Sequence, residues 1–406
     1  MDEVALYEHI LGLKAPWFVD TVELEESDGA VVVYLGVDEG EPLNCPECGR
    51  SSPRYDKRRR QWRHLDTCQY QTYVVADVPR VECEEHGCRM INVEWAEARS
   101  RFTAMFEALI IEWLLDSSIL AVARHFRLSW TAVDGIMRRA VTRGLARRKR
   151  LNIKRIGVDE IAFKKRHDYV TVITNKHGHV LAVEDDRAKF SLKNFYDRLT
   201  PRQKSAIETV SMDMAPAYIN VTLEEIPEAE RKIAFDKFHV AQALGKAVDY
   251  IRKEEHRELM RVRKGDELKG MRYTLLTNAA NLDRAQRQRI KALSSIAAKT
   301  GRAWALKEYA MSLWHYRTRG WAQRAWQRWL SWAMRSRLVP MKTVAHMIKD
   351  KLWGILNAIV HKADNAMAES VNSKIKTLKM KARGYRNRER YKTAILFHYG
   401  GLSLHP

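Results

Sequence analysis

The stretch that most restricts the fold is residues 154–163, K-R-I-G-V-D-E-I-A-F, because it places a carboxylate inside an apolar run. The pattern predicts a buried β-strand that carries Asp159 between Val158 and Ile161. Burying an ionised carboxylate is costly unless the group is paired or holds a metal ion. The rest of the chain must therefore supply partners for Asp159.

The segments after Asp159 predict an α/β core in residues 151–240. Helices are expected at 188–199 and 217–226, and the five expected strands are Arg155–Phe163, Tyr169–Asn175, His179–Glu184, Ile207–Met212 and Lys232–Asp236. Three antiparallel strands, then helix, strand, helix and strand, are the order of the ribonuclease-H-like fold. Asp213 follows the fourth strand, so we expect it beside Asp159 across the sheet. Glu160 points to the opposite face, because strand side chains alternate.

A third carboxylate, Glu369, lies in a predicted helix within residues 353–406, the last part of the core. Four polar residues share one face of that helix at i, i+4, i+7 and i+11: Asn365, Glu369, Asn372 and Lys376. A solvated face is the alternative, but an apolar side predicts that the helix docks on the core: Met367, Val371, Ile375 and Leu378. A basic tail follows, and its predicted phosphate contacts are Lys376, Lys379 and Arg386.

Clustered carboxylates favour divalent cations, which cancel their mutual repulsion and prefer oxygen ligands. Two such ions support phosphoryl transfer. The sequence therefore predicts that Asp159 and Asp213 form a site of this kind, with Glu369 as the third carboxylate beside them.

Residues 1–100 predict a small zinc-binding domain, because Cys45-Pro-Glu-Cys48-Gly is a turn of the kind that places two thiolates on one ion. The predicted ligands to Zn²⁺ are Cys45, Cys48, Cys83 and Cys88. His86 is the alternative for one of the second pair, and Cys68 is expected to take no part. Ordinary thiols in a small β-domain are the other interpretation. Basic residues beside the turn are expected to contact phosphates: Arg58, Arg59 and Arg60.

Residues 101–150 predict a helix-turn-helix domain with a basic linker at its end. Thr103 is suited to cap the first helix, and the last helix begins at Ser129 or Trp130. That helix carries four apolar residues inward: Val133, Ile136, Met137 and Val141. Its expected groove-facing residues are Thr131, Asp134, Arg138 and Arg139. A three-helix bundle without DNA binding is the alternative.

Residues 241–352 predict an all-helical insertion, because no proline occurs between Pro227 and Pro340. Four tryptophans and one alanine repeat at a spacing of roughly one heptad, a pattern that predicts a buried stripe along a helix. These residues are Trp314, Trp321, Ala325, Trp329 and Trp332. Base stacking by one or two of these rings is the alternative. The block interrupts the core, because Glu369 lies beyond it.

The charge balance indicates a polyanionic partner. The chain has 71 Lys and Arg against 50 Asp and Glu, a net charge of +21. Ribosome-binding and membrane-surface proteins share such a balance, so charge alone names no function. No window is long enough to span a membrane, and the N-terminus lacks the pattern of a signal peptide. We expect a soluble intracellular protein with an α+β, multidomain fold.

The ordered set of motifs resembles bacterial insertion-sequence transposases of the DDE type, specifically the ISL-three-like family. The resemblance includes the cysteine turn and the helix-turn-helix. It continues through five later segments: Gly157-Val-Asp159-Glu-Ile-Ala, Ser211-Met-Asp213-Met, Phe235-Asp-Lys-Phe-His239-Val, residues 365–376 and Gly384-Tyr385-Arg-Asn387. Ala368 stands where the family often has Gly, and the second cysteine pair is widely spaced.

The resemblance implies an enzyme that nicks double-stranded DNA at the element's terminal inverted repeats and joins the 3′-hydroxyls to target DNA. It implies that Asp159, Asp213 and Glu369 bind Mg²⁺ or Mn²⁺ and form the catalytic site. It implies that His239 touches the scissile phosphate, for which capping of the following helix is the alternative. It also implies that a homodimer or larger assembly joins two ends in the bacterial cytoplasm, on the nucleoid. A non-catalytic zinc and helix-turn-helix regulator is one alternative. Another ribonuclease-H-like nuclease is the second.

Overall fold

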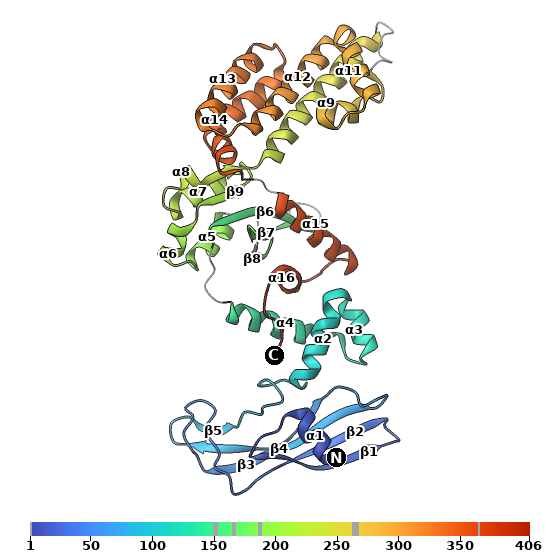
Figure 1. Cartoon of the computed structure of the whole chain (residues 1–406), viewed down its shortest axis with the longest axis vertical. Coiled ribbons are helices and arrows are strands. Elements are labelled where there is room, and N and C mark those ends of the chain that lie inside the picture. Colours follow the sequence, from blue (N-terminus) through green and yellow to red (C-terminus); the bar gives the residue numbers. More distant parts are fainter. Residues whose placement is uncertain (1, 149–152, 165–167, 186–188, 262–267, 364–365) are drawn as a thin grey trace. The chain divides into compact units, whose positions relative to one another are not determined.

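The computed structural model describes residues 2–148, 153–164, 168–185, 189–261, 268–363 and 366–406. The chain divides into two compact units, which are considered separately (Figure 1). The first comprises Met1–Arg148 and Leu402–Pro406, and the second comprises Lys149–Gly401. Among the described residues, no helix has both the length and the apolar character needed to cross a membrane.

The first unit opens with helix α1 (Glu3–Leu11) and a five-stranded sheet. Its strands are β1 (Trp17–Glu25), β2 (Ala30–Val37), β3 (Arg54–Arg63), β4 (Gln71–Cys83) and β5 (Gly87–Met90). The order is β1-β2-β4-β3, and β5 also pairs with β4. The basic segment beside the cysteine turn is therefore the edge strand β3. Three indoles in edge-to-face contact fill the core beneath the sheet, with Trp95 packing on Trp17 and Trp62 at centroid distances of 4.8 and 5.3 Å.

Three helices follow: α2 (Ala104–Asp116), α3 (Ile119–His125) and α4 (Trp130–Arg147). Each begins at a residue whose hydroxyl accepts a backbone N–H, and these caps are Thr103, Ser118 and Ser129. The predicted cap and the four predicted inward residues of α4 are confirmed, since all four are buried. Asp134 is also buried, at 5% exposure, so its predicted groove-facing position is wrong.

A buried carboxylate joins α2 to α4. Glu107 is 1% exposed and accepts hydrogen bonds from Ser100 Oγ at 2.8 Å, from Arg139 Nε at 3.0 Å and from Arg143 Nη2 at 3.2 Å. Arg143 also donates to Glu97 at 2.5 Å. This network places two arginines of α4 against protein groups.

Removing this carboxylate should destabilise the first unit strongly. Glu107→Ala removes the buried carboxylate that pairs with the half-buried Arg139 and with the buried Arg143, which keeps Glu97 as its second partner. We expect a loss of ~3–5 kcal/mol in unfolding free energy. Glu112→Ala on the same helix is the matched control, since Glu112 is exposed and pairs only at the surface with His405. Urea denaturation of the two variants compares them. Equal losses would contradict a role for burial.

The C-terminal segment Leu402–Pro406 packs on α4 within the first unit. Arg143 donates to the carbonyl of Leu404, and Arg147 donates to that of His405. Gly144 allows this approach, because an added Cβ there would lie 2.7 Å from Leu402 Cβ. Arg143 and Arg147, at the basic end of α4 where the linker was predicted to begin, therefore hold the C-terminal segment. The linker residues 149–152 lie outside the described residues.

The second unit is built on another five-stranded sheet, in the order β10-β9-β6-β7-β8. Its strands are β6 (Arg155–Lys164), β7 (Asp168–Asn175), β8 (Val180–Asp185), β9 (Thr209–Met212) and β10 (Ile233–Phe235). The first three are antiparallel, while β9 and β10 run parallel to β6. The five predicted strands are confirmed, with bounds shifted by one or two residues.

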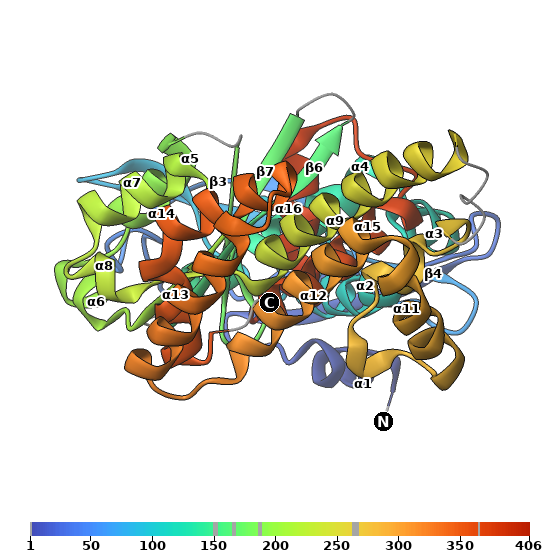
Figure 2. The ribbon, with the colours of Figure 1, turned by 90° about the horizontal axis from the view of Figure 1, so that it is seen from above.

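Helices flank this sheet and continue into a bundle. They are α5 (Lys189–Asp197), α6 (Pro201–Ala206), α7 (Pro216–Glu225), α8 (Ala229–Lys232), α9 (Lys237–Arg261), α10 (Arg272–Leu276), η2 (Ala279–Asn281), α11 (Arg284–Ile296), α12 (Ala298–Ser312), η3 (Leu313–His315), α13 (Arg319–Arg335) and α14 (Val339–His361). One hydrophobic core extends from Val158 and Phe235 in the sheet to Trp326 and Trp329 in the bundle. Helices α13 and α14 lie side by side in both views (Figures 1 and 2).

Helices α9 and α14 run through both predicted boundaries of the insertion, at 240/241 and 352/353. Gly354 lets α14 approach β10 closely, since an added Cβ would lie 2.4 Å from the Phe235 ring. Asn357 Nδ2 donates to the carbonyl of Ile233 at 2.8 Å. The bundle is thus attached to the strand that ends beside the candidate active site.

The tryptophan stripe is only partly as predicted. Trp329 and Ala325 are buried, and so is Trp326, which the heptad did not include. Trp321 is 57% exposed and lies on the opposite face of α13, so its predicted burial is wrong. The remaining helices are α15 (Ala366–Lys381) and α16 (Arg388–Tyr399). Val371 and Ile375 of α15 pack on the sheet as predicted, whereas Met367 is 46% exposed.

Candidate active site and metal centre

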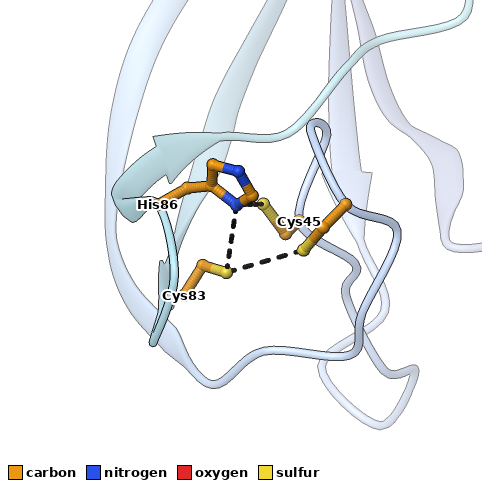
Figure 3. Close-up of side chains that lie close together, drawn as sticks. Cys45, Cys83 and His86 are labelled. Atoms are coloured by element: carbon orange, nitrogen blue, oxygen red, sulfur yellow. Dashed lines mark hydrogen bonds between the residues drawn. The ribbon is translucent and has the colours of Figure 1, made fainter.

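The first candidate site is a cluster of three thiols and one imidazole in the first unit. Its members are Cys45, Cys48, Cys83 and His86, whose ligand atoms all lie within 4.8 Å of one another. Cys83 Sγ is 3.6 Å from Cys48 Sγ and 3.7 Å from His86 Nδ1 (Figure 3). Ligands of one tetrahedral zinc ion, bound at ~2.0–2.3 Å, stand at such separations. The donor set therefore fits Zn²⁺.

Two local features form the cluster. Gly49 adopts φ +71° and closes the turn that contains Cys45 and Cys48. The hairpin between β4 and β5 turns directly after Cys83, and this turn brings His86 over the thiols. Cys88 lies beyond the turn in β5, paired with Glu82, and the cluster does not include it. Of the two alternatives for the second pair, the structure brings His86 to the cluster.

The surroundings prepare the cluster for a cation. Backbone N–H groups of His86 and Glu85, together with the His86 ring, lower the pKa of the Cys83 thiol to about 6. A thiolate is therefore favoured at neutral pH. Glu47 Oε2 lies 3.7 Å from His86 Nε2 and can orient the ring, as carboxylates do behind metal-bound histidines. Cys68 is exposed and lies outside the cluster.

The basic residues predicted to contact DNA occupy different environments. Arg58 and Arg59 are exposed on β3, and the Arg59 guanidinium lies 5.5 Å from the Tyr34 ring centroid. Arg60 is half-buried and donates to the carbonyl of Ser100 at 3.3 Å. On α4, Thr131 and Arg138 are exposed, whereas Arg139 is held by Glu107. Lys376 and Arg386 are exposed, and Lys379 donates to the Ala162 carbonyl at 3.0 Å.

The second candidate site is a row of aspartates at one edge of the sheet in the second unit. Gly157 of β6 pairs with Ser211 of β9, so Asp159 and Asp213, each two residues further on, lie at the same level. Phe235 of β10 pairs with Met212, so Asp236 lies level with Asp213. Three carboxylates therefore stand at the same level of neighbouring parallel strands, which are ~4.8 Å apart, with Asp159 inside β6 and Asp213 and Asp236 directly after β9 and β10.

The sequence interpretation missed Asp236. The predicted fifth strand, Lys232–Asp236, included this residue, whereas β10 ends at Phe235, so Asp236 directly follows its strand as Asp213 follows β9. Asp236 is 4% exposed, accepts the N–H of Phe238 at 3.0 Å and lies 3.4 Å from His239 Nδ1. It thus fixes the first turn of α9 and orients the imidazole.

The charges of this row act on one another. Burial raises the pKa of the Asp159 carboxyl, and the negative charges of Asp236 and Asp213 raise it further, against the N–H of Glu160 and the charge of His239. The hydrogen bond to Asp236 raises the pKa of His239, and Asp213 and Asp159 add to this shift. The site therefore favours an added positive charge.

The coupling between Asp236 and His239 gives a direct test. Asp236→Asn should lower the pKa of His239, because the anionic acceptor that stabilises the imidazolium is lost. In the parent chain His239 therefore stays protonated to a higher pH than in the variant. The attraction between the His239 imidazolium and Asp236 is lost as the pH rises through the native pKa of His239. A histidine NMR titration without divalent ions measures the shift. An unchanged titration would contradict the assignment.

Helix α15 supplies polar groups to the same edge. Asn372 is 8% exposed and its Nδ2 donates to Asp159 Oδ2, while the N–H of Glu160 donates to Asp159 Oδ1 at 2.7 Å. Glu369 lies one turn before Asn372 on the same helix face and is exposed. The contact made by Asn372 thus directs that face of α15 toward the aspartates. Asn365 lies outside the described residues.

Comparisons with known proteins agree with this layout. A family model described as a transposase of the ISL3 group with a DDE domain matches residues 156–395. A helix-turn-helix domain of transposase family ISL3 matches residues 91–141. A zinc-finger of the transposases of IS204, IS1001, IS1096 and IS1165 matches residues 41–88. Fold, cluster and matches together define a transposase with a zinc ribbon, a DNA-binding helix-turn-helix and a DDE domain.

Whole-chain relatives give the same result. The chain is 30% identical over 378 residues to the transposase for insertion sequence element IS1001 of Bordetella parapertussis. The aligned region covers 91% of this chain and 92% of the relative. It is 30% identical over 417 residues to the transposase for insertion sequence element IS1557 of Mycobacterium tuberculosis. That alignment covers 95% of this chain and 93% of the relative. The chain belongs to the ISL3 family of insertion-sequence transposases.

Proposed function

We propose that the chain binds the terminal inverted repeats of an insertion sequence, nicks the DNA at the element's ends and joins the 3′-hydroxyls to target DNA. The observation that carries the proposal is the row of Asp159, Asp213 and Asp236 at one sheet edge, faced by the helix that bears Glu369. A regulator that only binds DNA gives no reason for such a row. The order of the five strands supports a ribonuclease-H-like core, with the helices of residues 241–352 as its insertion.

The donor set fits divalent cations. Several carboxylates converge at one edge, and burial together with the charges of Asp236 and Asp213 raises the pKa of Asp159. Asp159, Asp213 and Glu369 would hold Mg²⁺ or Mn²⁺. When bound, such ions stabilise the charge that develops on the attacking and leaving oxygens of a phosphodiester.

The protein groups have separate roles in this proposal. Asn372 and the N–H of Glu160 hold the Asp159 carboxylate in one orientation. Asp236 raises the pKa of His239 and so favours the imidazolium form, which can donate to a phosphate oxygen of the scissile bond. Asp236 is thus a positioning residue and His239 is a candidate catalytic residue.

The first unit would bring the DNA. A zinc ion held by Cys45, Cys48, Cys83 and His86 would fix the end of the sheet, and the exposed residues Arg58, Arg59, Thr131 and Arg138 would contact the duplex. Lys376, Lys379 and Arg386 would extend the contact near the active site. Joining two ends requires at least a homodimer in the synaptic complex.

The test is cleavage of a duplex that carries the repeats flanking the gene, with Mg²⁺ and the full chain. We expect a cut at the repeat boundary that leaves a 3′-hydroxyl, and no cut in a scrambled duplex. Glu369→Gln should slow cleavage by roughly 10³-fold, equivalent to about 4 kcal/mol. Glu228→Gln, at an exposed residue, is the control. Cleavage by Glu369→Gln at the parental rate would contradict the proposal.

A further inference from the structure

The helical bundle of the second unit is markedly basic. Residues 241–352 contain 25 Lys and Arg against 9 Asp and Glu. Between Glu308 and Asp350 the sequence has eight Lys and Arg and no acidic residue. Surface helices usually intersperse both signs, as α9 does with Glu254 and Arg257. The excess therefore indicates a surface that meets a polyanion.

Helix α13 concentrates this charge on one face. Its buried face contains Ala322, Ala325, Trp326, Trp329 and Ala333. The opposite face carries four residues at i, i+3, i+7 and i+14, here called the α13 stripe: Trp321, Arg324, Arg328 and Arg335. All four are exposed. Among the described residues, no carboxylate forms an ion pair with these arginines.

The aromatic member of the stripe is held in place. The Arg324 guanidinium lies 4.2 Å from the Trp321 ring centroid, and its Nε donates to the Gly320 carbonyl at 3.4 Å. Trp326 and Trp329 satisfy the packing of the helix, so Trp321 is not needed for the core. An exposed indole beside a stacked guanidinium is the combination on which unpaired bases stack.

We propose that the α13 stripe binds an unpaired segment of a DNA strand, with a base stacked on Trp321 and phosphates held by the three arginines. Arg324 and Arg335 are ~16 Å apart along the helix, a span of a few nucleotides. The inference rests on the proposed function only in taking DNA as the polyanion. It requires neither metal binding nor cleavage.

The test is fluorescence anisotropy of a labelled single-stranded oligonucleotide with the full chain, without divalent ions, over a range of salt. Replacing Arg324, Arg328 and Arg335 together with Gln should weaken binding at least tenfold. It should lower the slope of log affinity against log salt by about 2, since each phosphate contact on a single strand contributes roughly 0.7. The matched control replaces three exposed arginines that pair with carboxylates, Arg198, Arg231 and Arg257, with Gln.

The indole is tested separately. Trp321→Ala should weaken binding about 5- to 100-fold, while Trp321→Phe retains most of it. Irradiation of an oligonucleotide containing 5-iododeoxyuridine should crosslink the tryptic peptide Gly320–Arg324. The proposal is overturned if the two triple variants lose equal affinity for the oligonucleotide, or if crosslinks are confined to other peptides. Tighter binding of an RNA of the same sequence would also overturn it. Asp159→Asn should leave this binding intact, which separates its failure from failure of the proposed catalysis.

Discussion

Asp159→Asn should abolish DNA cleavage and at the same time raise the thermal stability of the protein in buffer without Mg²⁺. The loss of activity should reach roughly 10³-fold or more, because a cation ligand and its charge are removed. The gain in stability has a different cause. Burial and the charges of Asp213 and Asp236 raise the pKa of Asp159, so its ionised form is disfavoured in the folded chain.

The pH dependence of this gain follows from the sign of the shift. Above the native pKa the parent chain ionises Asp159 at a cost, and Asn avoids that cost. As the pH falls through the native pKa the carboxyl becomes protonated, so the advantage of the variant should shrink. Calorimetric melting at pH 7.5 and pH 5 measures both effects. Asp197→Asn, at an exposed aspartate of α5, is the control. A destabilised but active Asp159→Asn variant would contradict the assignment.

His86→Ala should remove zinc from the first unit and unfold the region around it. Binding of a structural zinc ion is coupled to folding by about 10–16 kcal/mol, and a lost ligand gives up much of that free energy. Cys88→Ala should retain about one zinc per chain, as a four-ligand site without Cys88 requires. The pair of variants thus distinguishes the two candidates for the second cysteine pair.

Zinc content by elemental analysis and proteolysis of residues 41–88 together measure this effect. We expect rapid digestion of that region in His86→Ala and in chelator-treated parent chain, and resistance in Cys88→Ala. Zinc retained by His86→Ala and lost from Cys88→Ala would reverse the assignment.

Much of the second unit could be predicted because its strands are short apolar runs bounded by turn residues. The alternation around Asp159 and the run before Asp213 identify two neighbouring strands without further information. Asp236 was harder, because β10 has three residues and a strand of that length gives no alternation. Its significance lies in a register with β9 that only the assembled sheet defines.

The error at Asp134 in the first unit has a physical origin. Asp134 occupies a helix position that looks exposed in isolation but is buried in the folded unit, and the half-buried Arg139 is held by Glu107 of α2. The sequence pattern of a helix gives its apolar face and not the partner that covers the polar one. His86 and Cys88 differ by two residues, and the turn geometry decides between them.

Trp321 shows the same limit in the second unit. A heptad count places it with Trp314, Trp329 and Trp332, but α13 buries Trp326 and Trp329 and so turns Trp321 outward. Mixed spacings of tryptophan fit several helix faces equally well. Packing against α12 and α14 selects one of them.

The claim that the aspartate row and Glu369 form one cation site is tested most directly by replacing Mg²⁺ with Fe²⁺ and adding ascorbate. Radicals generated at a bound iron ion cut the backbone nearby, and sequencing of the fragments locates the ion. We expect cuts near Asp159, Asp213, Asp236 and Glu369, suppressed by excess Mg²⁺ and absent from Asp159→Asn. Cuts confined to other parts of the chain, or an unchanged pattern in Asp159→Asn, would contradict the site.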